Sequence, residues 1–173
     1  MSEPDAPFHD RFVALFNAHH HRMFRVLDRL SGDPELAADL AQEAFVRLYR
    51  RNAMPDAPEA WLISVALNLF RNVRTTRARR LRLLPPARAE EAMADPPPSP
   101  YLGAEAADRA GRVRAALATL PEREQRLLLL RAEGYGYRDM AAALDLNEAS
   151  VGTLLARARD GFRNAYGEAA DAH

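Results

Sequence analysis

Apolar residues recur every three or four positions along most of the chain, which is the spacing of helices with one buried side. The clearest stripe lies between Pro34 and Arg51 and consists of Ala37, Leu40, Ala41, Ala44, Phe45 and Leu48. A second stripe, upstream of a stop at Ser31, Gly32 and Asp33, consists of Phe12, Leu15, Phe16, Met23, Val26, Leu27 and Leu30. Because no segment alternates apolar and polar residues, the pattern predicts an all-α protein.

A third helix is predicted from about Glu59 to Arg82, and it divides into two faces at about 100° per residue. Its predicted apolar face consists of Leu62, Val65, Ala66, Leu69 and Val73. Its predicted polar face consists of Trp61, Ser64, Asn68, Arg71, Asn72, Thr75 and Arg79. We therefore expect the polar residues to leave this helix on one side.

Three further helices are predicted in the second half, and a tight turn joins the last two. A helix that starts near Pro121 stops at Gly134, and a short helix from Tyr137 to Leu144 follows it. The next helix begins at Glu148, after a turn made by Asp145, Leu146 and Asn147. This order is typical of a helix-turn-helix, whose second helix enters the major groove of DNA, although a plain helical hairpin has the same pattern.

The last helix has a predicted buried stripe and a predicted outward face. The buried stripe consists of Val151, Leu154, Leu155, Ala158 and Phe162. The outward residues are Ala149, Gly152, Thr153, Ala156 and Arg157, with Arg159 and Arg163 beside them. Asn147 is placed to cap this helix, so the amides of its first turn could also meet a phosphate.

Prolines mark a boundary between the two helical parts. The stretch from Leu84 to Pro100 holds six prolines, which fix φ and lack an amide donor, so we expect an extended, semi-rigid linker there. The predicted organisation is two small helical domains, 1–84 and 105–173, joined by a proline-rich linker, 85–104, with the helix-turn-helix in the second domain.

The amino-acid composition limits the classes of function that the protein can have. The 173 residues carry no formal net charge, so any attraction to nucleic acid must be local. The absence of cysteine excludes disulfides, zinc-thiolate sites and thiol catalysis. No apolar run approaches the roughly 20 residues that span a bilayer, and the acidic start "MSEPDAPFHD" is unlike a secretory signal, so we expect a cytoplasmic protein.

Positive charge is concentrated in "RNVRTTRARR", residues 71–80, which has five arginines and no acid. A charge run is usually a solvated face. Here it extends a polar face that contains the chain's single tryptophan and two asparagines. Arginine binds phosphate, asparagine bonds to base edges and an aromatic ring stacks on an unpaired base, which favours DNA binding. A packing role for Trp61 is the alternative.

Taken in order, these segments resemble a bacterial sigma factor of the extracytoplasmic-function group. "DPELAADLAQEAFVRLYRR" is similar to the family segment that docks on core RNA polymerase, and "PEAWLISVALNLFRNVRTTRARR" to the helix that captures the minus-10 promoter element. "LATLPEREQRLLLLRAEGYGYRDMAAALDL" followed by "ASVGTLLARAR" is similar to the reader of the minus-35 element.

The resemblance assigns roles by position. It implies a polymerase-docking role for Asp39, Gln42, Glu43 and Val46, with Phe45 more suited to packing. It implies a minus-10 role for Trp61, Ser64, Asn68, Arg71, Asn72, Arg74, Thr75 and Arg77. It implies a minus-35 role for Asn147, Ser150, Thr153, Arg157 and Arg159. The implied partners are core RNA polymerase and promoter DNA. An anti-sigma factor is a common further partner in the group, and no residue here identifies one.

Several positions depart from the family pattern. Leu67 and Asn72 stand where the family often has Arg and Asp, and Asp145 stands where a glycine is usual. Gly152, Leu154 and Ala156 replace positions that are often long and polar. Since the outward face is short, we expect minus-35 recognition to rely on phosphate contacts and DNA shape more than on base contacts.

Other functions have weaker support in the sequence. His19, His20 and His21 point about 100° apart on a helix and cannot converge on one metal ion, so we expect no metal and no cofactor. No phosphate-binding loop or acid-base cluster suggests an enzyme. The main alternative is a two-domain transcriptional regulator that binds duplex DNA through its helix-turn-helix and acts without polymerase.

Overall fold

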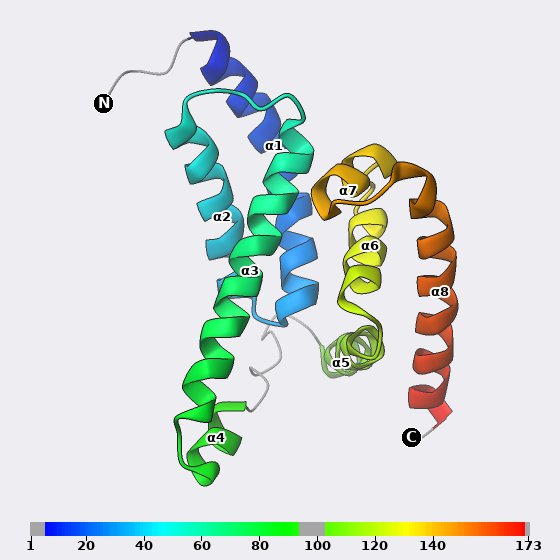
Figure 1. Cartoon of the computed structure of the whole chain (residues 1–173). Helices are drawn as coiled ribbons and strands as arrows, with labels where there is room; N and C mark the ends of the chain where they lie inside the picture. The colour runs from blue at the N-terminus through cyan, green and yellow to red at the C-terminus, as the bar shows by residue number, and fades with distance from the viewer. Residues whose placement is uncertain (1–5, 94–102, 172–173) are drawn as a thin grey trace. The chain divides into compact units, whose positions relative to one another are not determined.

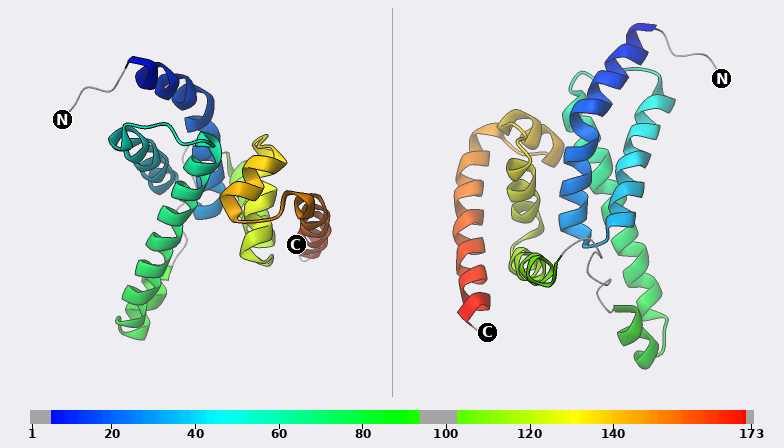
Figure 2. Two further views of the ribbon diagram at one scale, coloured as in Figure 1. Left: turned by 45° about the horizontal axis from the view of Figure 1, so that its top comes forward. Right: turned by 180° about the vertical axis from the view of Figure 1, so that it is seen from behind.

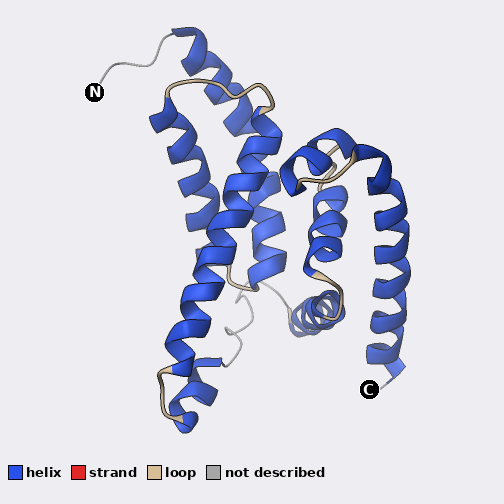
Figure 3. Ribbon diagram, viewed as in Figure 1, coloured by secondary structure: helices blue, strands red, loops and turns tan. Residues whose placement is uncertain are grey.

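The computed structural model describes residues 6–93 and 103–171, and within these ranges it contains helices and no strand (Figure 3). The predicted all-α class is confirmed. One compact unit contains α1 (Ala6–Ser31), α2 (Pro34–Arg51), most of α3 (Pro58–Arg82) and α4 (Pro86–Met93). The other contains α5 (Ala104–Ala118), α6 (Glu122–Ala132), α7 (Tyr137–Leu144) and α8 (Glu148–Asp171) (Figure 1). No helix in the described ranges has the length and apolar character that crossing a membrane requires.

A tight turn makes α1 and α2 an antiparallel pair (Figure 2). Gly32 has φ of 67°, in the left-handed region that favours glycine, and this ends α1. Asp33 then caps α2, because its Oδ1 accepts a hydrogen bond of 3.1 Å from the Leu36 amide. Pro34 follows at the first helical position, where its fixed φ suits the helix. Each residue of the turn therefore favours the observed break.

The core of the first unit forms along α2. All six residues predicted for its stripe are buried, and they are Ala37, Leu40, Ala41, Ala44, Phe45 and Leu48. The ring of Phe45 meets Phe16 at 5.0 Å and Phe12 at 6.1 Å, both edge-on. Phe16 is nevertheless 37% exposed, so its predicted burial is wrong. The rings of Phe12 at 6.4 Å and His20 at 4.5 Å also stack on Phe16, yet they cover it only in part.

The buried face of α3 differs from the predicted one. Leu62 and Ala66 are buried as expected, whereas Val65, Leu69 and Val73 are only half-buried. The other buried positions of the helix are Ala60, Ile63, Leu67 and Phe70. Apolar residues occupy more than half of the circumference of α3, so periodicity leaves open which arc meets the core. The observed arc includes the large ring of Phe70, whose burial removes the most apolar area from water.

Part of the expected linker is helical. We predicted an extended chain from Leu84 to Pro100, and α4 shows that this is wrong for Pro86–Met93. Pro86 stands at the first helical position, where the missing amide is not needed. The carbonyl of Pro85 accepts hydrogen bonds from the amides of Arg88 and Ala89, both at 3.0 Å. Residues 94–102, where the rest of the predicted linker falls, lie outside the described ranges.

In the second unit α8 packs against α5, α6 and α7. Val151, Leu155 and Ala158 are buried as predicted, while Leu154 and Phe162 are half-buried. Farther along α8, a Cβ placed on Gly161 would lie 2.8 Å from Cδ2 of Leu120. The absence of a side chain therefore lets α8 come close to the turn between α5 and α6.

Truncation of the buried stripe of α8 should destabilise the second unit. Leu155 is 0% exposed, so Leu155→Ala should lower the free energy of unfolding by about 2–5 kcal/mol through lost contacts and a residual cavity. Urea unfolding followed by circular dichroism measures this change. Leu154→Ala is the matched control, because its half-buried side chain should cost much less. Equal losses for the two variants would contradict the assigned stripe.

Candidate nucleic-acid interface

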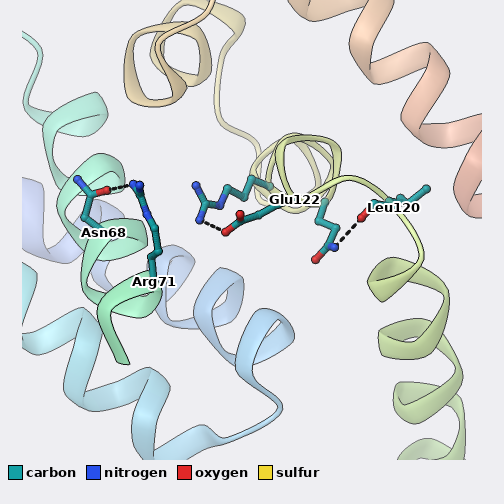
Figure 4. A network of polar contacts seen from close by, with 6 residues as sticks. Asn68, Arg71, Leu120 and Glu122 are labelled. Atoms are coloured by element: carbon teal, nitrogen blue, oxygen red, sulfur yellow. Dashed lines mark hydrogen bonds and ion pairs between the residues drawn. The ribbon is translucent and has the colours of Figure 1, made fainter. Parts of the chain in front are cut away.

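The polar face of α3 lies opposite its buried stripe. Asn68, Arg71 and Asn72 are exposed, and a guanidinium nitrogen of Arg71 donates a hydrogen bond to Oδ1 of Asn68 (Figure 4). Ser64 and Trp61, about one and two turns before Asn68, are half-buried. The further residues of this predicted face, Thr75 and Arg79, are exposed. Indole, amide and guanidinium groups thus leave one side of a single helix, and none of the three is sealed in the interior.

The C-terminal half of α3 and the segment after it form a strongly basic surface. No acidic residue stands between Glu59 and Glu90. The seven arginines between them are all exposed, and they are Arg71, Arg74, Arg77, Arg79, Arg80, Arg82 and Arg88. The guanidinium of Arg74 lies 5.7 Å from the ring centre of Phe70, a cation-π contact that ties one of them to the core. Such a surface attracts phosphates although the whole chain is neutral.

The turn between α7 and α8 has the geometry of a helix-turn-helix. Asp145 adopts φ of 54° and ψ of 53°, the left-handed conformation that ends α7. The amide of Leu146 donates to the carbonyl of Ala141 at 2.8 Å, which closes the helix end. Asn147 then caps α8, because its Oδ1 accepts a 3.0 Å hydrogen bond from the Ala149 amide. The predicted capping role of Asn147 is confirmed.

The outward face of α8 carries most of the residues expected to contact the minus-35 element. Ser150, Thr153 and Arg159 are exposed, as are the short side chains of Ala149 and Ala156. Arg157 is exposed over 68% of its side chain, yet its guanidinium is not directed only to solvent. Its Nε and Nη2 both lie 2.6 Å from Oε1 of Glu124 on α6.

Sequence reasoning missed two residues beside this face. Glu124 is buried, and the available signal was its place three residues before Leu127 on the apolar side of α6. Tyr137 opens α7 with its side chain partly exposed, and the guanidinium of Arg131 lies 5.5 Å from its ring centre. A Cβ on Gly152 would lie 3.7 Å from Cε2 of Tyr137, so that ring covers the position on α8 that lacks a side chain.

The predicted polymerase-docking residues lie along one face of α2. Asp39 and Gln42 are exposed, whereas Glu43 and Val46 are half-buried. Glu43 accepts a hydrogen bond from Nε of Arg47 at 2.8 Å, an ion pair between successive turns. The face is therefore polar and acidic, opposite the stripe that packs on α1.

The three consecutive histidines of α1 do not form a metal site. The ring of His20 stacks on Phe16, that of His21 stacks on Phe24 at 6.1 Å, and Nδ1 of His19 lies 3.5 Å from Arg22. Partial burial, together with the neighbouring charge of His21, lowers the pKa of His20. In the described part of the chain no group of three or more potential metal ligands converges.

Two family models match the two units, so fold and sequence define the same class of protein. Residues 15–80 match sigma-70 region 2, and residues 110–160 match sigma-70 region 4. The chain is 31% identical over 132 residues to the ECF RNA polymerase sigma factor EcfG of Rhodopseudomonas palustris, covering 74% of this chain and 68% of that protein. The chain belongs to the extracytoplasmic-function (ECF) sigma factors of the sigma-70 family.

One further relative is similar in sequence, and one solved structure is similar in fold. The ECF RNA polymerase sigma factor SigE of Mycolicibacterium smegmatis is 32% identical over 159 residues, 87% of this chain. The chain spans only 59% of the length of that protein. The fold is similar to the sigma factor RpoE of Bartonella quintana, solved in complex with the anti-sigma factor NepR, with a TM-score of 0.65 and 20% identity. That alignment covers 90% of this chain and 96% of the solved one.

The turn of the helix-turn-helix should tolerate a glycine. Asp145→Gly removes the steric penalty of a left-handed non-glycine residue, so the free energy of unfolding should rise by up to about 1 kcal/mol. Asp145→Val, which is β-branched, should lower it by a similar or larger amount. Urea unfolding of both variants measures the difference. Destabilisation by glycine would mean that the Asp145 side chain supports the turn.

Proposed function

We propose that the protein is a transcription initiation factor that binds core RNA polymerase in the cytoplasm and directs it to specific promoters. The observation that carries the proposal is the presence, in one chain of this family, of two different elements whose chemistry suits DNA. One is the basic polar face of α3, and the other is the helix-turn-helix of α7 and α8. The proposed role is recognition and positioning, and it includes no catalytic step.

The face of α3 is proposed to hold the minus-10 element as a single strand. Extruding a base costs a few kcal/mol of stacking, and each base captured on an aromatic ring recovers about 1–3 kcal/mol. Trp61 supplies such a ring, Asn68 and Asn72 supply amides, and the arginines that follow supply phosphate contacts. On these magnitudes, a strand can be opened without ATP.

The helix-turn-helix is proposed to hold the minus-35 element as duplex. Ser150, Thr153 and Arg159 are exposed on α8, and Asn147 fixes the start of the helix. Most of these side chains are short, which supports phosphate contact and shape recognition for much of the interface. Recognition of the minus-10 and minus-35 sequences by the same protein gives a promoter specificity that neither sequence could supply alone.

A pull-down with core RNA polymerase followed by run-off transcription tests the proposal. A sigma factor should bind core enzyme stably and make transcription start at defined promoters. Binding to promoter duplex with no association with core enzyme would instead support the regulator that acts without polymerase.

The acidic face of α2 should be needed for polymerase binding. Asp39→Arg reverses an exposed charge at the centre of that face, and the affinity for core enzyme should fall about tenfold or more. Ala38→Arg is the control for a new arginine on α2, since it introduces the same side chain at the neighbouring exposed position, turned away by about 100°, although it changes the net charge by +1 where Asp39→Arg changes it by +2. Fluorescence anisotropy with labelled protein measures both. Equal effects of the two changes would count against docking through the Asp39 face.

Promoter binding by the holoenzyme should depend strongly on salt, because the α3 arginines displace counterions. Arg74→Ala and Arg77→Ala should each reduce the slope of log affinity against log salt by about one. Arg11→Ala, an exposed arginine on α1, should leave that slope unchanged. The slope comes from filter binding over a range of salt concentrations. Unaltered slopes for both α3 variants would remove the phosphate role assigned to them.

A further inference from the structure

An ion pair joins α6 to the recognition helix α8. Glu124 and Arg157 are 33 residues apart, and Oε1 of Glu124 receives both Nε and Nη2 of Arg157 at 2.6 Å. The nearby pair of Glu122 and Arg126, by contrast, joins two residues of α6 itself (Figure 4). Only the first of these two pairs therefore fixes a side chain of the helix expected to enter the major groove.

The two members of this pair have very different surroundings. The side chain of Glu124 is 6% exposed, whereas that of Arg157 is 68% exposed. A buried carboxylate is costly unless it is paired, so Glu124 holds the guanidinium strongly. The rigid fork of arginine is held at its Nε edge, which fixes the direction of the whole planar group. The rest of that group is open to a ligand.

The position of Arg157 makes this fixed direction relevant to DNA. It follows Thr153 by one turn on the outward side of α8, where neighbouring side chains are short. A free arginine there would reach any phosphate within its range. A guanidinium held at one edge can reach only groups that lie in its own plane.

We propose that Glu124 is a positioning residue for promoter readout, holding the Arg157 guanidinium toward base edges and away from phosphates. This inference rests on the proposed function of the helix-turn-helix. It makes Arg157 a sequence-selective contact on a face that is otherwise suited to phosphate contact. Glu124 itself, being buried, does not touch DNA.

Removal of the Glu124 charge should reduce selectivity rather than affinity. In Glu124→Gln the guanidinium is released to phosphates, so the affinity ratio between matched and scrambled minus-35 sequences should fall about tenfold. Affinity for the scrambled sequence should hold or rise, with a salt slope steeper by about one. The matched sequence is the one that wild-type holoenzyme selects from a randomised promoter library. Binding is measured with holoenzyme reconstituted from the full chain and core polymerase.

Three further variants distinguish a positioning role of Glu124 from a role in folding. Glu122→Gln removes a carboxylate from the same helix and should leave the ratio unchanged. Arg157→Lys keeps the positive charge but lacks the planar guanidinium. It should therefore lower the affinity ratio between matched and scrambled sequences while preserving the salt slope. If Glu124→Gln fails to fold, an unchanged ratio with Arg157→Lys overturns the inference. In an Arg157→Ala background, Glu124→Gln should have no further effect on the ratio.

The binding results that would overturn the positioning role of Glu124 differ from those that would overturn the proposed function. If wild-type holoenzyme selects a minus-35 sequence and Glu124→Gln shows the same ratio, positioning by Glu124 is wrong and the proposed function stands. Equal weakening of both sequences, as expected from a purely structural role, also overturns the inference. If wild-type holoenzyme prefers no sequence at all, both the proposed function and the inference fail.

Discussion

A buried stripe along α3 decides which of its side chains can reach DNA. Leu62, Ala66 and Phe70 lie in the core, and each is at most 5% exposed. Because successive residues turn by about 100°, fixing this stripe directs Asn68 and Arg71 to the opposite side. The promoter-opening role proposed for the helix depends on this division. A rotation of α3 by about a half turn would bury the amides and expose the aliphatic residues.

The second unit uses the same division and adds a polar constraint. Burial of Val151, Leu155 and Ala158 sets the orientation of α8. Packing alone leaves long exposed side chains free to move, whereas the ion pair with Glu124 restricts Arg157 directly. The two units thus differ in how they present charge. The arginines of α3 form a broad surface suited to phosphates, and Arg157 is a single held group suited to a defined position.

Much of the fold could be predicted from the sequence. The six-residue stripe of α2, the bounds of α7 and the capping role of Asn147 all depend on local spacing and local hydrogen bonding. The wrong predictions, for α4 and for the buried face of α3, concern segments whose structure the local sequence pattern does not determine. The prolines around α4 were taken as breakers, although Pro86 suits a first turn, and the apolar excess on α3 left its buried arc undetermined. The pairing of Glu124 with Arg157 needs tertiary contact, which no spacing within one helix can give.

The central claim is that the polar face of α3 captures an opened promoter strand. Fluorescence of 2-aminopurine placed within the minus-10 element of holoenzyme-bound promoter reports unstacking most directly. The account predicts a strong rise with the wild-type protein, a rise that Trp61→Phe largely preserves, and its loss with the double change of Trp61→Ala and Asn68→Ala while the holoenzyme remains bound. A full rise with the double variant would contradict the account.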